Sequence, residues 1–110
     1  MNNTNESANE IEIIEHNLQH LAMQNQAINV ELNEATNALN ELNTTSDDVY
    51  RMIGNIMLRA NPELLKKELE ERKHVLELRL SSIEKQELLL DAKMKQIRSE
   101  LLKGKSLSTK

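Results

Sequence analysis

Two histidines form the pattern in this sequence that comes nearest to a metal site. His16 and His20 are four residues apart, so on a helix both imidazole rings lie on one face and could chelate a metal ion. Stable sites for such metals need further ligands. No third ligand is fixed by the sequence, and both histidines lie outside the apolar pattern described below. We therefore expect no metal site.

Carboxylates also cluster in the sequence, but their setting does not favour catalysis. Glu68, Glu70 and Glu71 fit the solvated face of a helix better than an acid–base pair, because two packed helices form no concave pocket. With only Gly54 and Gly104, the chain has no glycine-rich phosphate loop. The net charge is −4 and Tyr50 is the one aromatic residue, which disfavours nucleic-acid binding. We expect neither an enzyme nor a cofactor, and no nucleic-acid partner.

The composition favours long helices over a compact core. Hydrophobic residues make up 38% of the 110 residues and aromatic residues only 1%. The first ten residues are polar and acidic, so we expect no signal peptide, and no apolar run reaches the ~18 residues of a membrane span. The chain has no cysteine, which is compatible with a reducing compartment. We expect a cytoplasmic protein without a membrane partner.

Two long segments repeat apolar residues with the seven-residue period of a coiled coil. In the first, nine of ten seam positions are apolar, and Asn25 is the exception. Its columns are Ile11, Leu18, Asn25, Leu32 and Leu39, and Ile14, Leu21, Ile28, Ala35 and Leu42. The columns of the second segment are Leu69, Leu76, Ile83, Leu90 and Ile97, and Lys73, Leu80, Glu87, Met94 and Leu101. The sequence predicts two long helices that pack along these seams.

Capping residues predict where the helices begin and end. Ser7 and Glu10 match a capping box, Asn61 with Pro62 is a strong helix start, and Gly104 is a typical helix stop. We therefore expect a disordered tail over residues 1–7, a helix over 8–43, a linker and hairpin over 44–61, a second helix over 62–103 and a disordered tail over 104–110.

The stretch between the helices has the residue types of a β-hairpin. Two β-favouring runs meet at Gly54 and Asn55, which tolerate the positive φ that a two-residue primed turn needs. The predicted fold is therefore all-α dominated (α with one β-hairpin), with a long antiparallel two-helix coiled coil joined by the hairpin. Similar seam lengths favour the antiparallel arrangement, because it aligns both ends of the coil.

Charged and polar residues add expectations about how the helices pair. Residues 1–50 contain nine acidic residues and no Lys or Arg, whereas residues 51–110 carry a net charge of +5. An acidic helix beside a basic one favours their pairing, although both could simply be solvated faces. The antiparallel registers bring Asn25 and Glu87 within about a turn of each other, where they could share one polar layer. Glu68 and Arg72 have the i,i+4 order of a surface ion pair.

Apolar residues outside the seam indicate that the chain is not complete alone. A two-stranded hairpin is marginal in water and has unpaired backbone groups on both edges. One partner helix would also leave Leu64, Leu65, Val75 and Leu78 exposed. We expect hairpins of several chains to oligomerise into a β-barrel or sheet. The residues assigned to oligomerisation are Val49, Tyr50, Met52, Ile53, Gly54, Asn55, Ile56, Met57 and Leu58.

The central residues resemble those of the prefoldins, and among them the beta-type subunits of archaea. The resemblance runs from about Ile11 to Leu102 and is most specific over residues 49–58. A single hairpin is similar to the beta type, because alpha-type subunits carry two. The resemblance implies a hexamer of two alpha-type and four beta-type subunits, with paired β-barrels from which the coiled coils project. It also implies an ATP-independent chaperone that holds non-native client proteins at the coiled-coil tips and delivers them to a group II chaperonin.

Both chain termini are expected at the end of the coil away from the hairpin, and this tip is the predicted client-binding end. If the coil frays there, seam residues become an apolar surface for clients. The predicted client-binding residues are Ile11, Ile13, Ile14, Leu18, Met94, Ile97, Leu101 and Leu102. Ile13 and Leu102 lie off the seam and are the better candidates, because the seam residues fit a purely structural role equally well.

Two points stay open at this stage. The coiled coil could serve as a structural or adaptor oligomerisation protein without client binding. The C-terminal residues Lys103, Lys105 and Lys110 are basic, so a chaperonin contact that depends on acidic tips would have to use Glu6, Glu10 and Glu12 or be absent.

Overall fold

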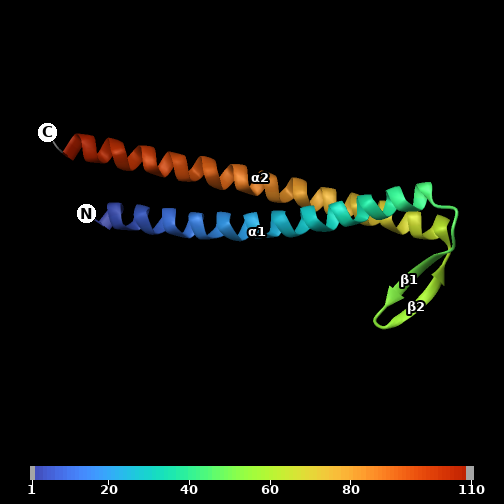
Figure 1. The fold of residues 1–110 in the computed structure, drawn as a ribbon. Coiled ribbons are helices and arrows are strands. Elements are labelled where there is room, and N and C mark those ends of the chain that lie inside the picture. The colour runs from blue at the N-terminus through green and yellow to red at the C-terminus, as the bar shows by residue number, and fades with distance from the viewer. Residues whose placement is uncertain (1, 109–110) are drawn as a thin grey trace. The chain divides into compact units, whose positions relative to one another are not determined.

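The computed structural model describes residues 2–108, with side chains described for residues 5–104. The elements are α1 (Asn2–Thr44), β1 (Val49–Ile53), β2 (Ile56–Ala60) and α2 (Pro62–Ser108) (Figure 1). The described residues form two compact units. The first contains the residues up to Gln26 and from Ser81 onward, and the second is Ala27–Leu80. Two long helices with one two-stranded hairpin confirm the predicted fold class.

Both helices are longer than their capping signals predicted. α1 begins at Asn2 rather than at Ser7, so the predicted capping box lies inside the helix. The residues before Ser7 include no Pro or Gly, and their propensities differ from that of Ala by less than about 0.7 kcal/mol each. α2 continues past Gly104 to Ser108. Parts of the two predicted tails, residue 1 and residues 109–110, lie outside the described residues.

Gly104 does not act as the predicted helix stop. Among the described residues, Gly54 is the only glycine with a positive φ, so Gly104 does not adopt the left-handed conformation of a C-cap. One glycine costs a helix about 1 kcal/mol, and the flanking Leu102 and Lys103 are good helix formers.

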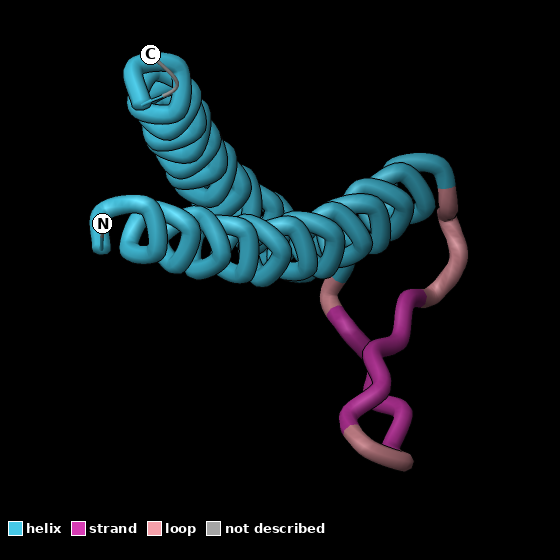
Figure 2. Tube along the Cα trace, turned by 90° about the vertical axis from the view of Figure 1, so that its left-hand side faces the viewer, coloured by secondary structure: helices cyan, strands magenta, loops and turns pink. Residues whose placement is uncertain are grey.

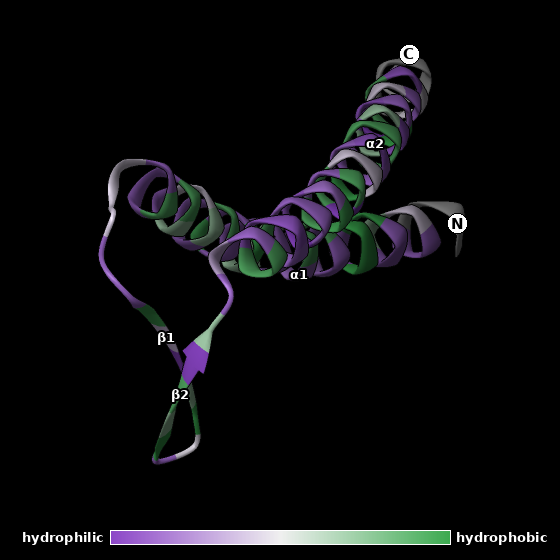
Figure 3. Cartoon of the chain, turned by 90° about the vertical axis from the view of Figure 1, so that its right-hand side faces the viewer, coloured by the Kyte–Doolittle hydropathy of each residue, from purple (hydrophilic) through white to green (hydrophobic). Residues whose placement is uncertain are grey.

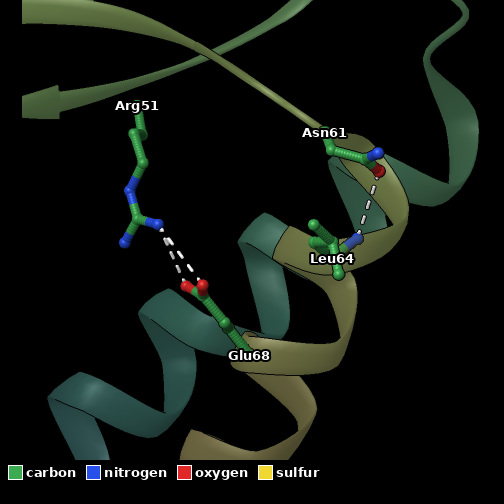
Figure 4. Close-up of polar contacts among 4 residues, drawn as sticks. All are labelled: Arg51, Asn61, Leu64 and Glu68. Carbon is green, nitrogen blue, oxygen red and sulfur yellow. Dashed lines mark hydrogen bonds and ion pairs between the residues drawn. The ribbon is translucent and has the colours of Figure 1, made fainter.

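The start of α2 has the predicted local chemistry. The side-chain Oδ1 of Asn61 accepts a hydrogen bond from the backbone N–H of Glu63 at 2.9 Å. It also accepts one from the backbone N–H of Leu64 at 3.3 Å (Figure 4). Backbone N–H groups of the first turn have no partner within the helix. Pro62 is the first residue of α2, as predicted. At the end of α1, the backbone N–H of Thr45 donates to the carbonyl oxygen of Glu41 at 3.0 Å.

The predicted seams are the buried face of both helices. Every seam position in either helix is buried or half-buried, and the residue Leu76 is only 1% exposed. Full burial of a large aliphatic side chain such as that of Leu76 stabilises the fold by roughly 1.5–3 kcal/mol. The buried positions are Ile14, Leu21, Ala35, Leu39, Leu42, Leu76, Ile83, Met94 and Ile97.

Polar contacts between the helices confirm the antiparallel arrangement in the first unit. In the first unit, Asn25 Nδ2 donates to Glu87 Oε1 at 3.4 Å, so the predicted polar layer is present. Arg98 and Glu15 form an ion pair of 2.9 Å in the same unit. Residue numbers fall along α2 as they rise along α1, which defines an antiparallel pair.

The ion pairs of the second unit differ from the i,i+4 pair predicted for α2. Glu68 and Arg72 do not form the predicted pair with each other. Arg72 Nη2 contacts Glu31 Oε2 of α1 at 2.7 Å, and Glu68 Oε2 contacts Arg51 of β1 at 3.1 Å. An i,i+4 pair is worth only about 0.3–0.5 kcal/mol, so a well-placed partner on another element displaces it easily. The Arg72–Glu31 pair of this unit and the Arg98–Glu15 pair of the first unit each join an acid of α1 to an arginine of α2, as the charge segregation predicted.

The hairpin has the predicted register and a defined turn. Ile53 pairs with Ile56 and Val49 with Ala60 in an antiparallel ladder, which leaves Gly54 and Asn55 as the two turn residues. Gly54 has φ +59°, whereas no described residue other than glycine has a positive φ. A positive φ at the first turn position alone is typical of a type II′ turn, in which that position is normally glycine.

Loops join the hairpin to both helices (Figure 2). In the loop before β1, the backbone N–H of Asp47 donates to Thr45 Oγ1 at 3.2 Å. Asp48 then accepts a hydrogen bond of 2.8 Å from Arg59 of β2. The Asp48–Arg59 pair joins the residue before β1 to β2 at the base of the hairpin.

The buried seam makes Leu76 the most sensitive position in the chain. We expect Leu76→Ala to lower the free energy of unfolding by about 2–5 kcal/mol, because it removes buried atoms and leaves a cavity. Leu88→Ala, at a position that is 71% exposed on the same helix, should change it by less than about 0.5 kcal/mol. Urea denaturation followed by far-UV circular dichroism measures both. Equal losses in the two variants would contradict the burial of the seam.

The polar layer should set helix alignment at a cost in stability. We expect the double variant Asn25→Leu with Glu87→Leu to unfold at a higher temperature than the unmodified chain, because apolar seam residues pack without desolvating polar groups. Glu87→Leu alone should gain less, because the polar side chain of Asn25 stays in the seam. Thermal unfolding of the chain, both single variants and the double variant gives the coupling energy. A double variant less stable than both single variants would refute the polar layer.

Candidate functional site

The predicted tip residues divide into a packed cluster and two exposed side chains. Ile14, Met94 and Ile97 are buried together in the first unit. The half-buried residues packed against them are Ile11, Leu18, Leu90 and Leu101. Six of the eight predicted client-binding residues therefore lie in one apolar cluster formed by both helices.

Ile13 and Leu102 lie outside this cluster, as their positions off the seam predicted. Their side chains are 61% and 68% exposed. Large aliphatic groups with this exposure stabilise the monomer little, because most of their surface remains in water. They are the tip residues that an apolar ligand could contact without any separation of the helices.

A charged pair borders the packed cluster. Arg98 follows the buried Ile97, and its guanidinium donates to Glu15 Oε1 at 2.9 Å. Both side chains are about half exposed, so the pair contributes at most about 1 kcal/mol and less in high salt. Packing of the apolar side chains is therefore what closes this part of the coil.

The hairpin residues assigned to oligomerisation have no apolar core of their own. Six apolar side chains of the two strands are exposed, and the strand colours in Figure 3 show this apolar character. These residues are Tyr50, Met52, Ile53, Ile56, Met57 and Leu58, while Val49 is half-buried. Such exposure in a two-stranded sheet is typical of a surface that binds another protein.

The two faces of the hairpin differ in their relation to α2. Arg51 contacts Glu68 of α2 with Nη1–Oε distances of 3.1 and 3.4 Å (Figure 4). Side chains alternate along a strand and match across a pair, so Leu58 shares the face of Arg51. Met52 and its cross-strand partner Met57 lie on the opposite face. The ion pair therefore turns one face of the hairpin toward α2 and leaves the other facing away.

Two exposed leucines of α2 are not among the predicted site residues. Leu88 and Leu89 are each 71% exposed. Both lie between seam positions, and an apolar residue at such a position is itself the sequence signal for exposed apolar surface. They lie in the first unit, whereas the hairpin belongs to the second.

Two other predictions concern metals and membranes. His16 and His20 are exposed, and no group of three His, Cys, Asp or Glu residues within the described part of the chain is arranged to hold a metal ion. Over the same part of the chain, neither helix has a stretch long and apolar enough to cross a membrane.

Comparison with known proteins places the chain in a family. The family described as prefoldin subunit matches residues 5–105. "Prefoldin subunit beta" of Thermococcus kodakarensis is 32% identical over 94 residues, which cover 84% of this chain and 80% of that protein. The protein of the same name from Methanosarcina acetivorans is 33% identical over 94 residues, which again cover 84% of this chain and 80% of that protein.

A solved structure agrees with these relatives. The crystal structure of the prefoldin beta subunit from Thermococcus strain KS-1 superposes with a TM-score of 0.84 and 29% sequence identity. The match covers 92% of this chain and 90% of the other. The seam, the single hairpin and these matches together show that the chain belongs to the prefoldin subunit family and is of the beta type.

Proposed function

We propose that this chain is the beta-type subunit of an ATP-independent holdase chaperone of the cytoplasm. In this proposal two alpha-type subunits and four copies of this chain form a hexamer through their hairpins. The hexamer captures non-native proteins at the coiled-coil tips and delivers them to a group II chaperonin. The chain itself performs no catalysis and needs no cofactor.

The exposed hairpin supports the proposed assembly. Its strands are only five residues long, and apolar side chains are exposed on both faces. An isolated hairpin of this size is marginal in water, whereas a closed barrel leaves no strand edge unpaired. Hairpins from several subunits would therefore stabilise each other.

The observation that carries the holdase proposal is the exposure of Ile13 and Leu102 beside the apolar tip cluster. Two isolated side chains bind an apolar segment weakly. A hexamer presents the same pair on several subunits, and simultaneous contacts raise the overall affinity without any new contact type. Fraying of the helix ends would add Ile11, Ile14 and Leu101 to the surface.

The burial of the tip seam favours a structural role for its members in the resting chain. Ile14, Met94 and Ile97 are all buried. A passive adaptor coiled coil would need this packing and nothing more. The proposal therefore assigns the first client contact to Ile13 and Leu102, and the two functions differ in what happens when those side chains are removed.

The proposed assembly can be tested by the mass of the complex that this chain forms with an alpha-type subunit. We expect this chain, of 12.7 kDa, to form a hexamer with four copies of itself when it is mixed with an alpha-type prefoldin subunit, and a smaller species alone. Size-exclusion chromatography with light scattering measures both masses. A mixture that elutes as two separate species would overturn the assembly.

The proposed client contact predicts a loss of holdase activity without a loss of stability. We expect the double variant Ile13→Ser with Leu102→Ser, in the assembled hexamer, to suppress aggregation of a chemically unfolded client less well at equal ratios. Its melting temperature should stay unchanged, because both side chains are mostly exposed. Light scattering of the client and thermal unfolding of the hexamer are the measurements.

A matched control removes the same amount of exposed apolar surface elsewhere. Leu88→Ser with Leu89→Ser deletes two leucines that are outside the tip cluster, and we expect this hexamer to retain its suppression. No suppression by the unmodified hexamer at any ratio would favour the passive adaptor instead.

A further inference from the structure

Two methionines lie opposite each other on the hairpin. Met52 of β1 pairs with Met57 of β2 in the antiparallel ladder, so both side chains are on the same face. Cβ atoms of directly opposed residues are about 4.5–5.5 Å apart, which brings the two thioethers close together. The two residues are 66% and 61% exposed. In the free chain both thioethers are therefore accessible to small molecules in water.

The face that carries this methionine pair is the one available to fill a barrel. Arg51 is on the opposite face and contacts Glu68 of α2 at 3.1 Å, so the face of Met52 and Met57 is turned away from the chain's own helix. In a barrel made of several hairpins, one face of each hairpin fills the interior. The same two methionines are then exposed before assembly and buried after it.

Oxidation changes the polarity of a methionine side chain. Hydrogen peroxide transfers one oxygen atom to the thioether: the O–O bond breaks, an S–O bond forms, and the peroxide, which gains the two electrons that sulfur loses, leaves as water. The product, methionine sulfoxide, is polar and carries a hydrogen-bond acceptor. Burial of a polar group without a partner is unfavourable. A sulfoxide is therefore tolerated on a free hairpin but opposes burial of that hairpin in a barrel.

The methionine face has few donors for a buried sulfoxide. The other ladder residues on this face are Tyr50 and Arg59, which form the neighbouring cross-strand pair. The guanidinium of Arg59 is already held by Asp48 at 2.8 Å. The tyrosine hydroxyl supplies a single donor, whereas two sulfoxides present two acceptors. Oxidation of both methionines therefore leaves at least one sulfoxide without a partner on its own hairpin.

The other methionines with described side chains differ in burial or in place. Met94 is 9% exposed and packs with Ile14 and Ile97 in the tip cluster. Met23 is 65% exposed, but it lies in the first unit, whereas the hairpin belongs to the second. Met23 is therefore an exposed reference methionine outside the hairpin.

We propose that Met52 and Met57 form an oxidation site through which peroxide acts on the unassembled chain and blocks its assembly through the hairpin. The proposal rests on the assembly proposed above and adds a chemical condition to it, namely that both thioethers are reduced when hairpins meet. Assembly in turn protects the pair by burying it. A methionine sulfoxide reductase reverses the block, because two thiols are converted to a disulfide while the sulfoxide oxygen leaves as water.

Assembly after peroxide treatment tests the site. The full chain is treated with hydrogen peroxide, catalase removes the excess, and peptide mass spectrometry measures oxidation at each methionine. Mixing with an untreated alpha-type subunit over a dilution series, followed by light scattering, gives the concentration at which the hexamer forms. We expect that concentration to rise by about tenfold or more, because each copy of the chain would bury two sulfoxides. Treatment with the reductase and a dithiol should reverse the rise.

Non-oxidisable variants assign the effect to the pair. Each variant is compared with itself before and after peroxide, and circular dichroism verifies that the treated chains keep their helices. Met52→Leu with Met57→Leu has apolar side chains of similar volume but no thioether, so peroxide should not raise its assembly concentration. Met23→Leu keeps the pair and should show the same rise as the unmodified chain.

Oxidation rates test whether assembly protects the pair. In the preformed hexamer, Met52 and Met57 should be oxidised by about tenfold or more slowly than in the free chain, because susceptibility follows exposure. Met23 should react at the same rate in both. Peptide mass spectrometry over a time course of peroxide treatment measures all three.

The outcomes separate this inference from the proposed function. Unchanged assembly of a chain whose Met52 and Met57 are fully converted to sulfoxide overturns the oxidation site, and so does an equal rise in the double leucine variant. Equal oxidation rates in the hexamer and the free chain overturn the burial of this face. Hexamer formation by the untreated chain would still support the chaperone assembly in each case. An untreated chain that forms no hexamer refutes the assembly and the oxidation site together.

Discussion

Burial of the heptad seams is the interaction on which the rest of the structure depends. α1 is 43 residues long, but it is rich in asparagine, whose side chain competes with the backbone for hydrogen bonds. Such a helix is marginal in water unless its apolar face is covered. α2 covers that face, and Leu76 at the seam is almost fully removed from solvent. The capping bonds of Asn61 and the ion pairs between the helices then act on a pair that is already held together by apolar packing.

The seam also determines what remains available for other proteins. Two helices in a coiled coil bury only a narrow stripe on each, so apolar residues outside it stay in water unless a partner covers them. In this chain they include Ile13, Leu102, Leu64 and the hairpin side chains such as Met57. One structural rule therefore leaves exposed both the surface proposed for assembly and the surface proposed for clients.

Most of the fold could be predicted because its signals are periodic or steric. Apolar residues every seven positions define the seam residue by residue, and Gly54 with Asn55 defines a two-residue turn. Helix ends were predicted less well, because the signals at Ser7 and Gly104 are worth only about 1 kcal/mol each and the flanking residues can outweigh them. The partner of Glu68 could not be predicted at all. Its choice of Arg51 depends on where the hairpin lies against α2, which no local pattern encodes. For the candidate site, pairing of the seams predicts the tip cluster, whereas Leu88 and Leu89 lie between the seam columns, where the heptad pattern assigns no partner.

The segregation of charge has a consequence for chemical modification. Every lysine of the chain lies at position 66 or beyond, so acetylation or an amine-reactive label cannot reach a side chain of α1. Each modified lysine removes a positive charge from the α2 side while the nine acidic residues before Arg51 keep theirs. Lysine acylation would therefore give both helices a net negative charge and oppose their pairing, whereas the Arg72–Glu31 and Arg98–Glu15 ion pairs, which involve no lysine, would persist.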